Sequence, residues 1–202
     1  LINPGFLHLN HLLNILSLSS FLGIVVLSQT IVVLSGGEGI DLSVGAVISL
    51  STVIASQIMD GSNALFLPAA LVVLSVGFLL GLINGFGAAF LKIPPLVMTL
   101  AMSSVTQGLG LVYTQGQPKG RAAGVLVAAG TGRTGPFPNI LLVWIIIIIL
   151  AAVILQRSKM GKIVYGTGEN ELTAELSGIR TRRVRLLVFG FSGLISAFAG
   201  LC

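Results

Sequence analysis

The stretch that decides the fold is Arg157 to Arg185, which reads RSKMGKIVYGTGENELTAELSGIRTRRVR. It is the only long polar island between two strongly apolar segments. It holds seven of the eleven Lys and Arg residues of the chain, namely Arg157, Lys159, Lys162, Arg180, Arg182, Arg183 and Arg185. In a membrane protein, a short loop this rich in Lys and Arg lies on the cytoplasmic side, which fixes the orientation of all other segments.

The middle of this loop predicts a short helix of about residues 170–177. Gly178 follows as a C-cap, and the basic residues after it suit the negative end of a helix. A folded helix on a cytoplasmic loop is a surface on which another protein docks.

The composition indicates that the bilayer is the solvent. The chain is 54% hydrophobic and 8% charged, with a mean hydropathy of +1.04, whereas a soluble domain carries about 25% charged residues. We therefore predict an all-α, polytopic integral membrane protein with one transmembrane domain over residues 1–202 and a cytoplasmic loop at 157–185. The net charge of +5 is read as a topology signal and not as nucleic-acid binding, because the basic residues cluster beside apolar runs.

Six apolar runs predict about six transmembrane helices, at about 12–34, 46–59, 64–91, 96–113, 140–155 and 186–202. The last run is shorter than the about 20 residues that a span needs, so we expect a domain incomplete at both ends. Counting back from the basic loop places 60–63 and 114–139 outside, Lys92 inside, and 35–45 inside or at membrane depth. Two rows of small residues at every fourth position predict close helix packing: Gly77, Gly81 and Gly85, and Ser192, Ser196 and Gly200.

Two acids, Glu38 and Asp41, lie between the first two apolar runs among several glycines. Ionisable groups at membrane depth are costly and usually functional, and a break in a helix is tolerated there only where it is buried in protein or lines a water-filled cavity. Two compatible interpretations stay open. Asp41 caps the second helix, or the segment contributes to a translocation pathway through Gly37, Glu38, Gly39, Asp41 and Ser43.

Asn84 and Gln107 are polar side chains inside apolar runs. Hydrogen bonds between helices are the favoured interpretation, and a place on the solute pathway is the alternative.

Two further motifs, a pair of histidines and a glycine motif, do not indicate a metal or dinucleotide site. His8 and His11 lack a third ligand nearby and are read as interfacial residues, so we expect no metal site. Residues 130–135 match G-x-G-x-x-G after the strand-like 125–129, but Pro136-Phe-Pro follows in place of the helix that a dinucleotide site requires. The sequence has no Walker A motif and no set of nucleophile, base and acid, so we expect neither an enzyme nor a bound cofactor.

Three separated stretches resemble permeases of the ribose-type branch of ABC importers. Gly39-Ile-Asp-Leu-Ser-Val-Gly45 resembles their G-I-D-L-S-V-G segment, and residues 81–116 resemble their long helix, Ile-Pro-Pro turn and following helix. Residues 161–200 resemble their main cytoplasmic loop and next helix, with Glu175-Leu-Ser-Gly-Ile179 as the most specific part. The three stretches occur in the family's order and cover most of the chain.

The resemblance implies a multi-pass subunit of the bacterial inner membrane with about ten spans in the complete family member. It implies a second permease copy or homologue in the same lipid bilayer, cytoplasmic ABC ATPase subunits that bind the ATP, and a periplasmic binding protein that delivers a monosaccharide. The short helix would be the coupling helix that meets the ATPase, through Asn170, Glu171, Ala174, Glu175, Leu176, Ser177 and Gly178. Since the spans hold few aromatic and polar groups, we expect the permease to bind solute only loosely.

Two departures from the family pattern concern the same regions. Glu38 is an added residue in a turn that often reads Gly-Gly-Ile-Asp, and Glu169-Asn-Glu-Leu-Thr-Ala stands where relatives often have Gly-Asn-Pro-Glu-Ala-Ala. Two other classes of function remain alternatives. One is an ion-gradient-coupled secondary transporter that uses Glu38 and Asp41. The other is a membrane scaffold subunit bound through the 170–178 helix.

Overall fold

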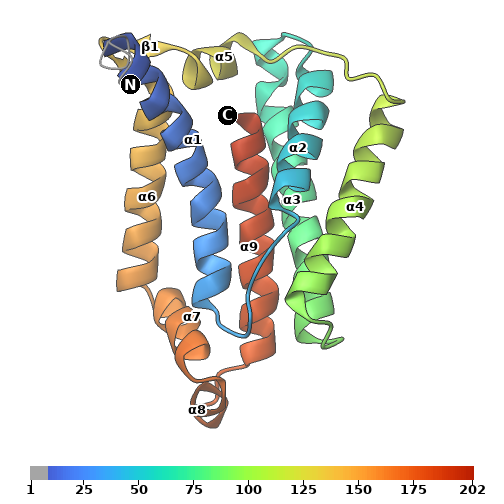
Figure 1. Ribbon diagram of the computed structural model, residues 1–202, viewed down its shortest axis with the longest axis vertical. Coiled ribbons are helices and arrows are strands. Elements are labelled where there is room, and N and C mark those ends of the chain that lie inside the picture. Colours follow the sequence, from blue (N-terminus) through green and yellow to red (C-terminus); the bar gives the residue numbers. More distant parts are fainter. Residues whose placement is uncertain (1–8) are drawn as a thin grey trace, which may run out of the picture.

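The computed structural model describes residues 9–202 and consists almost entirely of helices. The long helices of this part of the chain run along the long axis of the molecule (Figure 1): α1 (Leu9–Leu34), α2 (Val44–Met59), α3 (Phe66–Ala89), α4 (Pro95–Thr114), α6 (Asn139–Arg157) and α9 (Thr181–Leu201). Short elements join their ends: η2 (Asn63–Leu65), α5 (Gly124–Gly130), β1 (Arg133–Thr134), β2 (Phe137–Pro138), α7 (Lys159–Glu169) and α8 (Glu171–Leu176).

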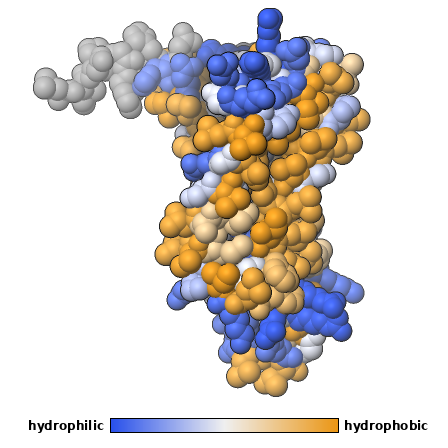
Figure 2. Space-filling model, turned by 90° about the vertical axis from the view of Figure 1, so that its right-hand side faces the viewer, coloured by the Kyte–Doolittle hydropathy of each residue, from blue (hydrophilic) through white to orange (hydrophobic). Residues whose placement is uncertain are grey.

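The predicted polytopic membrane fold is confirmed. Within residues 9–202, five helices are long and apolar enough to cross a membrane, namely α1, α3 with the preceding η2, α4, α6 and α9. On the face that Figure 2 shows, hydrophobic side chains form a broad belt between hydrophilic ends. The remaining predicted span, 46–59, corresponds to α2, whose 16 residues are fewer than the about 20 that a bilayer core requires.

The connections alternate between the two ends of the bundle, as predicted (Figure 1). One end carries α7, α8, the end of α1 and the turn between α3 and α4, and we call it the loop end. The other carries α5, β1, β2 and the turn between α2 and α3, and we call it the opposite end. The structure shows which connections share an end of the bundle. The side of the membrane that each end faces is inferred from the basic residues.

The closest helix pair, α3 and α9, meets through the first predicted row of small residues. A Cβ atom added at Gly77 would lie 2.5 Å from the carbonyl oxygen of Gly193, and one added at Gly81 would collide with the carbonyl oxygen of Phe189. Small side chains let helix backbones approach this closely, which gives extensive van der Waals contact in a bilayer. The packing prediction for this row is therefore confirmed.

The second row of small residues places α9 against α2. Ser192 and Ser196 are fully buried, and a Cβ added at Gly200 would lie 2.6 Å from the carbonyl oxygen of Ile48. The hydroxyl of Thr52 donates a hydrogen bond of 2.8 Å to the carbonyl oxygen of Gly200. Half of the α9 span is buried, against 6% of the α6 span, so α9 is a central helix and α6 a peripheral one.

The chain between α1 and α2 is irregular and climbs alongside α9 before α2 begins part-way up the bundle (Figure 1). We call residues 35–43 the break. Gly36, Gly37 and Glu38 have φ angles of +76°, +65° and +55°, which turn the chain sharply. Glu38 is unusual in this conformation because its Cβ is crowded there, whereas glycine adopts it freely. The chain is thus irregular between the first two apolar runs, where its glycines allow a break.

One local expectation is wrong. Residues 125–129 looked strand-like because they are rich in Val and Ala, but they lie in α5, a helix of seven residues. The antiparallel pair β1 and β2 follows, with Arg133 opposite Pro138 and Thr134 opposite Phe137. The glycines at 130–135 therefore join a helix to a two-stranded ribbon, which is not the strand-to-helix context of a dinucleotide site. His8, the first half of the rejected metal pair, lies outside the described residues.

Candidate functional site

Asp41 is the centre of a buried polar cluster inside the bundle. Its side chain is on the break, and the residue is 2% exposed. Oδ1 accepts hydrogen bonds from the backbone N–H of Ser43, at 2.9 Å, and from the Ser43 hydroxyl, at 2.6 Å. Oδ2 accepts one from the hydroxyl of Ser192 on α9, at 3.1 Å. A buried carboxylate is tolerated only with such partners, because its desolvation is otherwise very costly.

Side chains from three more helices complete this group, which we call the Asp41 cluster. Asn84 on α3 donates from Nδ2 to the Ser43 hydroxyl at 2.8 Å. Thr99 on α4 accepts from the backbone N–H of Leu42 at 3.0 Å. Gln29 on α1 bonds both the N–H and the carbonyl oxygen of Asp41. The cluster therefore fixes the break against α1, α3, α4 and α9 at once.

The geometry bears on whether Asp41 caps α2 or belongs to a translocation pathway. The N-cap residue of α2 is Ser43, and its side chain makes no capping bond, so the assignment of Asp41 as the cap is wrong by two positions. The carboxylate nevertheless holds the N–H of Ser43, directly before the helix. The oxygen Oδ1 of Asn84 is buried and has no hydrogen-bond partner among the described residues, so the cluster retains one unused acceptor. Asp41, Ser43 and Asn84 thus belong to one site.

Other residues predicted for a pathway lie apart from this cluster. Glu38 is exposed, as is Gly37, while Gly39 is buried close to the carbonyl oxygen of Val32. Gln107 bonds only Ser103, one turn earlier in α4, at 3.3 Å. Asn84 thus bonds the residue directly before α2, whereas Gln107 makes no bond to another described helix. Glu38 and Asp41 do not form a paired site.

The short helix predicted in the basic loop is α8, and both of its ends are capped. Asn170 is the N-cap residue, and its Oδ1 accepts the N–H of Thr173 at 2.9 Å. At the other end the N–H of Gly178 donates to the carbonyl of Glu175 at 2.9 Å, and that of Ile179 to the carbonyl of Ala174 at 3.0 Å. This is the Schellman pattern, which needs a residue with positive φ after the helix, and Gly178 has φ +83°.

The outer surface of α8 is apolar. Leu172 and Leu176 are 67% and 82% exposed, while Ala174 is buried against the rest of the loop. Residues four apart lie on one face of a helix, so the two leucines form a single patch. Figure 2 shows hydrophobic surface at the tip of the loop end, beyond the hydrophilic zone that borders the belt. We call Leu172 and Leu176 the leucine patch.

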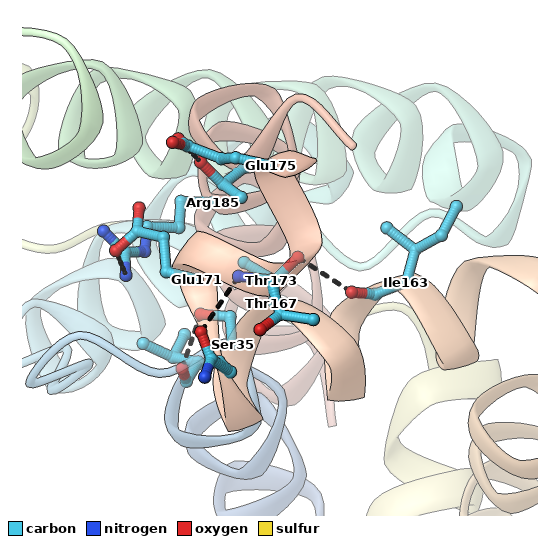
Figure 3. A network of polar contacts seen from close by, with 10 residues as sticks. Ser35, Ile163, Thr167, Glu171, Thr173, Glu175 and Arg185 are labelled. Atoms are coloured by element: carbon cyan, nitrogen blue, oxygen red, sulfur yellow. Dashed lines mark hydrogen bonds and ion pairs between the residues drawn. The ribbon is translucent and has the colours of Figure 1, made fainter. Parts of the chain in front are cut away.

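Two acids of α8 tether the helix to the start of α9 (Figure 3). Glu175 Oε1 accepts a hydrogen bond of 2.8 Å from the hydroxyl of Thr181, and Glu171 Oε2 pairs with Arg185 Nη2 at 2.8 Å. Thr181 and Arg185 were not among the residues predicted for the site. Several arginines lie close together at the start of α9, and the sequence does not show which of them pairs with an acid 14 residues earlier. Nothing in the sequence around Thr181 indicates that it bonds Glu175.

The break and the basic loop are in direct contact. A Cβ added at Gly168, near the end of α7, would collide with the carbonyl oxygen of Leu34, and one added at Gly37 would collide with the guanidinium of Arg185. Thr167 and Ser35 nearby turn their hydroxyls back to carbonyls of their own segments, at 2.8 and 2.7 Å, so the contact itself is close backbone packing (Figure 3). Arg185 therefore lies between the break and α8.

Residues 9–202 also contain the kinds of side chain that bind metal ions. No three side chains of His, Cys, Asp or Glu in this range are placed to hold a metal ion. What the arrangement offers is mechanical: a capped helix with an apolar face, joined through Arg185 and α9 to a buried polar cluster.

Comparisons with known proteins agree on one class. Residues 11–202 match the family model described as branched-chain amino acid transport system, permease component. A ribose import permease protein of Haemophilus influenzae is 35% identical over 205 residues, covering the whole chain and 62% of the relative. One of Bacillus subtilis is 35% identical over 99% of the chain and 62% of the relative. A fructose import permease protein of Rhizobium meliloti is 35% identical over 92% of the chain and 53% of the relative.

The chain thus spans about three fifths of the length of the ribose import permeases that it matches. No solved structure matches it.

Proposed function

This chain belongs to the permease family described as the branched-chain amino acid transport system, and on that premise we propose that it forms part of the membrane subunit of an ATP-driven importer. The observation that carries the proposal is α8, with its capped ends, its leucine patch and its two tethers to α9. An exposed apolar pair at the tip of a polar loop is a surface that a partner protein covers.

The solute that we propose is a monosaccharide. The support is the similarity to relatives named as ribose and fructose import permeases, at 35% identity. The described part of the chain offers no catalytic constellation, so ATP hydrolysis is assigned to a separate cytoplasmic subunit. A periplasmic binding protein would deliver the sugar, and a second permease copy or homologue would complete the channel.

The orientation follows from charge. Seven of the eleven Lys and Arg residues lie in 157–185, so the loop end faces the cytoplasm and the opposite end faces outward. We place the protein in the inner membrane of a bacterium, because its named relatives come from bacteria. In this orientation the leucine patch points at the compartment that holds ATP.

The mechanism derives from the contacts of α8. An ATPase that moves α8 also moves Thr181 and Arg185 at the start of α9, because Glu175 and Glu171 bond them. The helix α9 is central, packs on α3 and α2, and donates from Ser192 to Asp41 at 3.1 Å. A displacement of α8 therefore reaches the break and the Asp41 cluster through bonded and packed groups, as a rigid-body motion of a helix.

The gradient-coupled alternative has little support. It needs an ionisable pair open to a coupling ion, but Glu38 is exposed on the turn while both oxygens of the Asp41 carboxylate are engaged by serine groups. A scaffold subunit would use the same α8 surface to bind its partner. It would differ from the importer only in that it transports no solute.

The test is sugar uptake into proteoliposomes that contain the full-length protein with its ATPase subunits and binding protein. Uptake of D-ribose or D-fructose that requires ATP and persists when sodium and proton gradients are collapsed supports the importer. Uptake that stops on collapse of a gradient, and does not need ATP, contradicts it. Stable assembly with the ATPase and no uptake of either sugar favours the scaffold.

A further inference from the structure

A polar hollow of about 380 Å³ opens at the opposite end of the molecule, where α2 and α4 both finish. Its size falls in the range of about 300–1,000 Å³ typical of small-molecule sites. The side chains that line it are mainly polar, with one aromatic ring: Gln57, Asp60, Tyr113, Gln115 and Lys119. It lies at the end of the bundle away from α8, and the proposed transport mechanism has not used it.

The walls of the hollow are held in place by backbone bonds. The N–H of Gly61 donates to the carbonyl of Arg121 at 2.9 Å, and the hydroxyl of Ser56 donates to the carbonyl of Lys119 at 3.3 Å. A Cβ added at Gly120 would collide with the carbonyl of Ser56, which shows how closely the 115–121 segment lies on α2. The side chains at the rim therefore project from a fixed frame and not from a free loop.

The polar side chains of the hollow are not engaged by other side chains of the described residues. Gln57, Asp60, Gln115 and Lys119 make no side-chain hydrogen bond or ion pair with another residue in 9–202. Together they supply two amides, a carboxylate and an ammonium group, so donors and acceptors are both present. Sugar hydroxyls act as donor and acceptor at the same time, and this mixed set matches them.

Charge and ring chemistry narrow the ligand class. Among the lining residues, the carboxylate of Asp60 and the ammonium of Lys119 balance in charge, which suits a neutral ligand. Tyr113 is 44% exposed and offers an aromatic face. The face of such a ring carries negative charge density and attracts the weakly positive C–H groups of a sugar.

We infer that this hollow is an entry site for a neutral monosaccharide, on the side from which the solute arrives. The inference rests on the proposed function, since it takes the substrate class and the orientation from it. The site is open and its polar groups are solvated, so water competes with the sugar and we expect a dissociation constant of roughly millimolar size. Such weak binding agrees with the expectation that the permease holds solute only loosely.

The test uses the full-length protein with its ATPase subunits in lipid nanodiscs, and saturation-transfer difference NMR with D-ribose and D-fructose. We expect a saturable signal for at least one sugar. Tyr113→Ala should reduce it by about fivefold, the scale of one aromatic contact. The matched control is Tyr165→Ala, because Tyr165 is 43% exposed but lies on α7 at the loop end, and it should leave the signal unchanged.

A second variant tests the site independently in case Tyr113→Ala does not fold. Asp60→Asn keeps the side-chain shape and suits the left-handed backbone of this position, where φ is +38°. It should also weaken the sugar signal, since the amide donates where the carboxylate only accepts.

Each other outcome has a definite meaning. A wild-type complex that takes up sugar with ATP but gives no saturable signal overturns the entry site and leaves the importer intact. A wild-type complex that assembles but shows no ATP-driven uptake contradicts the importer instead. If Tyr113→Ala keeps the sugar signal but loses binding of the purified binding protein, the hollow is a protein-docking surface and the inference is wrong.

Discussion

Arg185 on α9 and Glu171 on α8 form an ion pair, with 2.8 Å between Nη2 and Oε2. Glu171 is the first residue of α8, where a carboxylate also favours the positive end of the helix. The same guanidinium of Arg185 lies against Gly37 in the break. One side chain thus contacts both the helix that meets the partner and the segment that carries Asp41.

Removal of this pair should uncouple the loop from the membrane helices more than it destabilises the protein. The side chain of Glu171 is 42% exposed and that of Arg185 is 20% exposed. The substitution Glu171→Gln should therefore cost no more than about 1 kcal/mol of stability. We expect ATP hydrolysis to continue while the sugar transported per ATP falls. Glu169→Gln is the control, since Glu169 is an exposed acid of the same loop without an ion pair in the described structure. Equal effects of both variants would show that Arg185 does not transmit the motion.

Gly178→Ala should fray the end of α8. Alanine in the left-handed conformation that Gly178 adopts, with φ +83°, is strained by roughly 1 kcal/mol. The backbone amides of α8 should then exchange with deuterium several-fold faster, because helix opening scales with this free energy. Gly166→Ala is the matched control, since Gly166 lies inside α7 with nothing within 4 Å of an added Cβ, and it should slow exchange or leave it unchanged. Unchanged exchange in Gly178→Ala would argue against the cap.

Gly81→Ala should separate α3 from α9. The added methyl group would collide with the carbonyl oxygen of Phe189, a backbone atom that cannot rotate away. Overpacking of this kind costs about 1–3 kcal/mol, so the thermal unfolding midpoint in detergent should fall. Gly108→Ala, in α4 with open space around it, should leave the midpoint unchanged. A similar midpoint for both variants would mean that α3 and α9 pack less closely than described.

Asp41→Ala should disrupt the break, whereas Asp41→Asn should be milder. Alanine leaves the N–H and hydroxyl of Ser43 and the hydroxyl of Ser192 without their acceptor, and each unsatisfied buried group costs about 1–3 kcal/mol. Asparagine still accepts from Ser43. We expect low yield and low uptake for Asp41→Ala and partial uptake for Asp41→Asn. Normal yield and full uptake in Asp41→Ala would contradict this structural role.

The sequence predicted what local patterns determine. Long apolar runs predict spanning helices because the bilayer leaves the backbone no other partner, and the rows around Gly81 and Ser196 predict close packing because their period is that of a helix. Gly178 after a short polar helix predicts the cap for the same local reason. These features needed no knowledge of which helices touch.

Features that depend on distant partners could not be predicted. Asp41 and Ser192 are 151 residues apart, and nothing in either segment marks the other. Residues 125–129 contain two valines, and valine is common in strands, so the segment resembled a strand. The tertiary context decided for the helix α5. Gln107 bonds Ser103 within its own helix, and the choice of partner depends on the packing.

The central claim is that α8 is the surface on which the ATPase docks, and one measurement tests it most directly. Leu172→Asp with Leu176→Asp replaces the leucine patch, which is 67% and 82% exposed, without touching the caps of α8. Burial of a leucine contributes about 1.5–3 kcal/mol, so co-purification of the ATPase subunits with the full-length protein should fall by far more than about tenfold. Val127→Asp, at an exposed valine of α5 on the opposite end, should co-purify normally. Retained ATPase binding in the double variant, with the protein folded, would contradict the account.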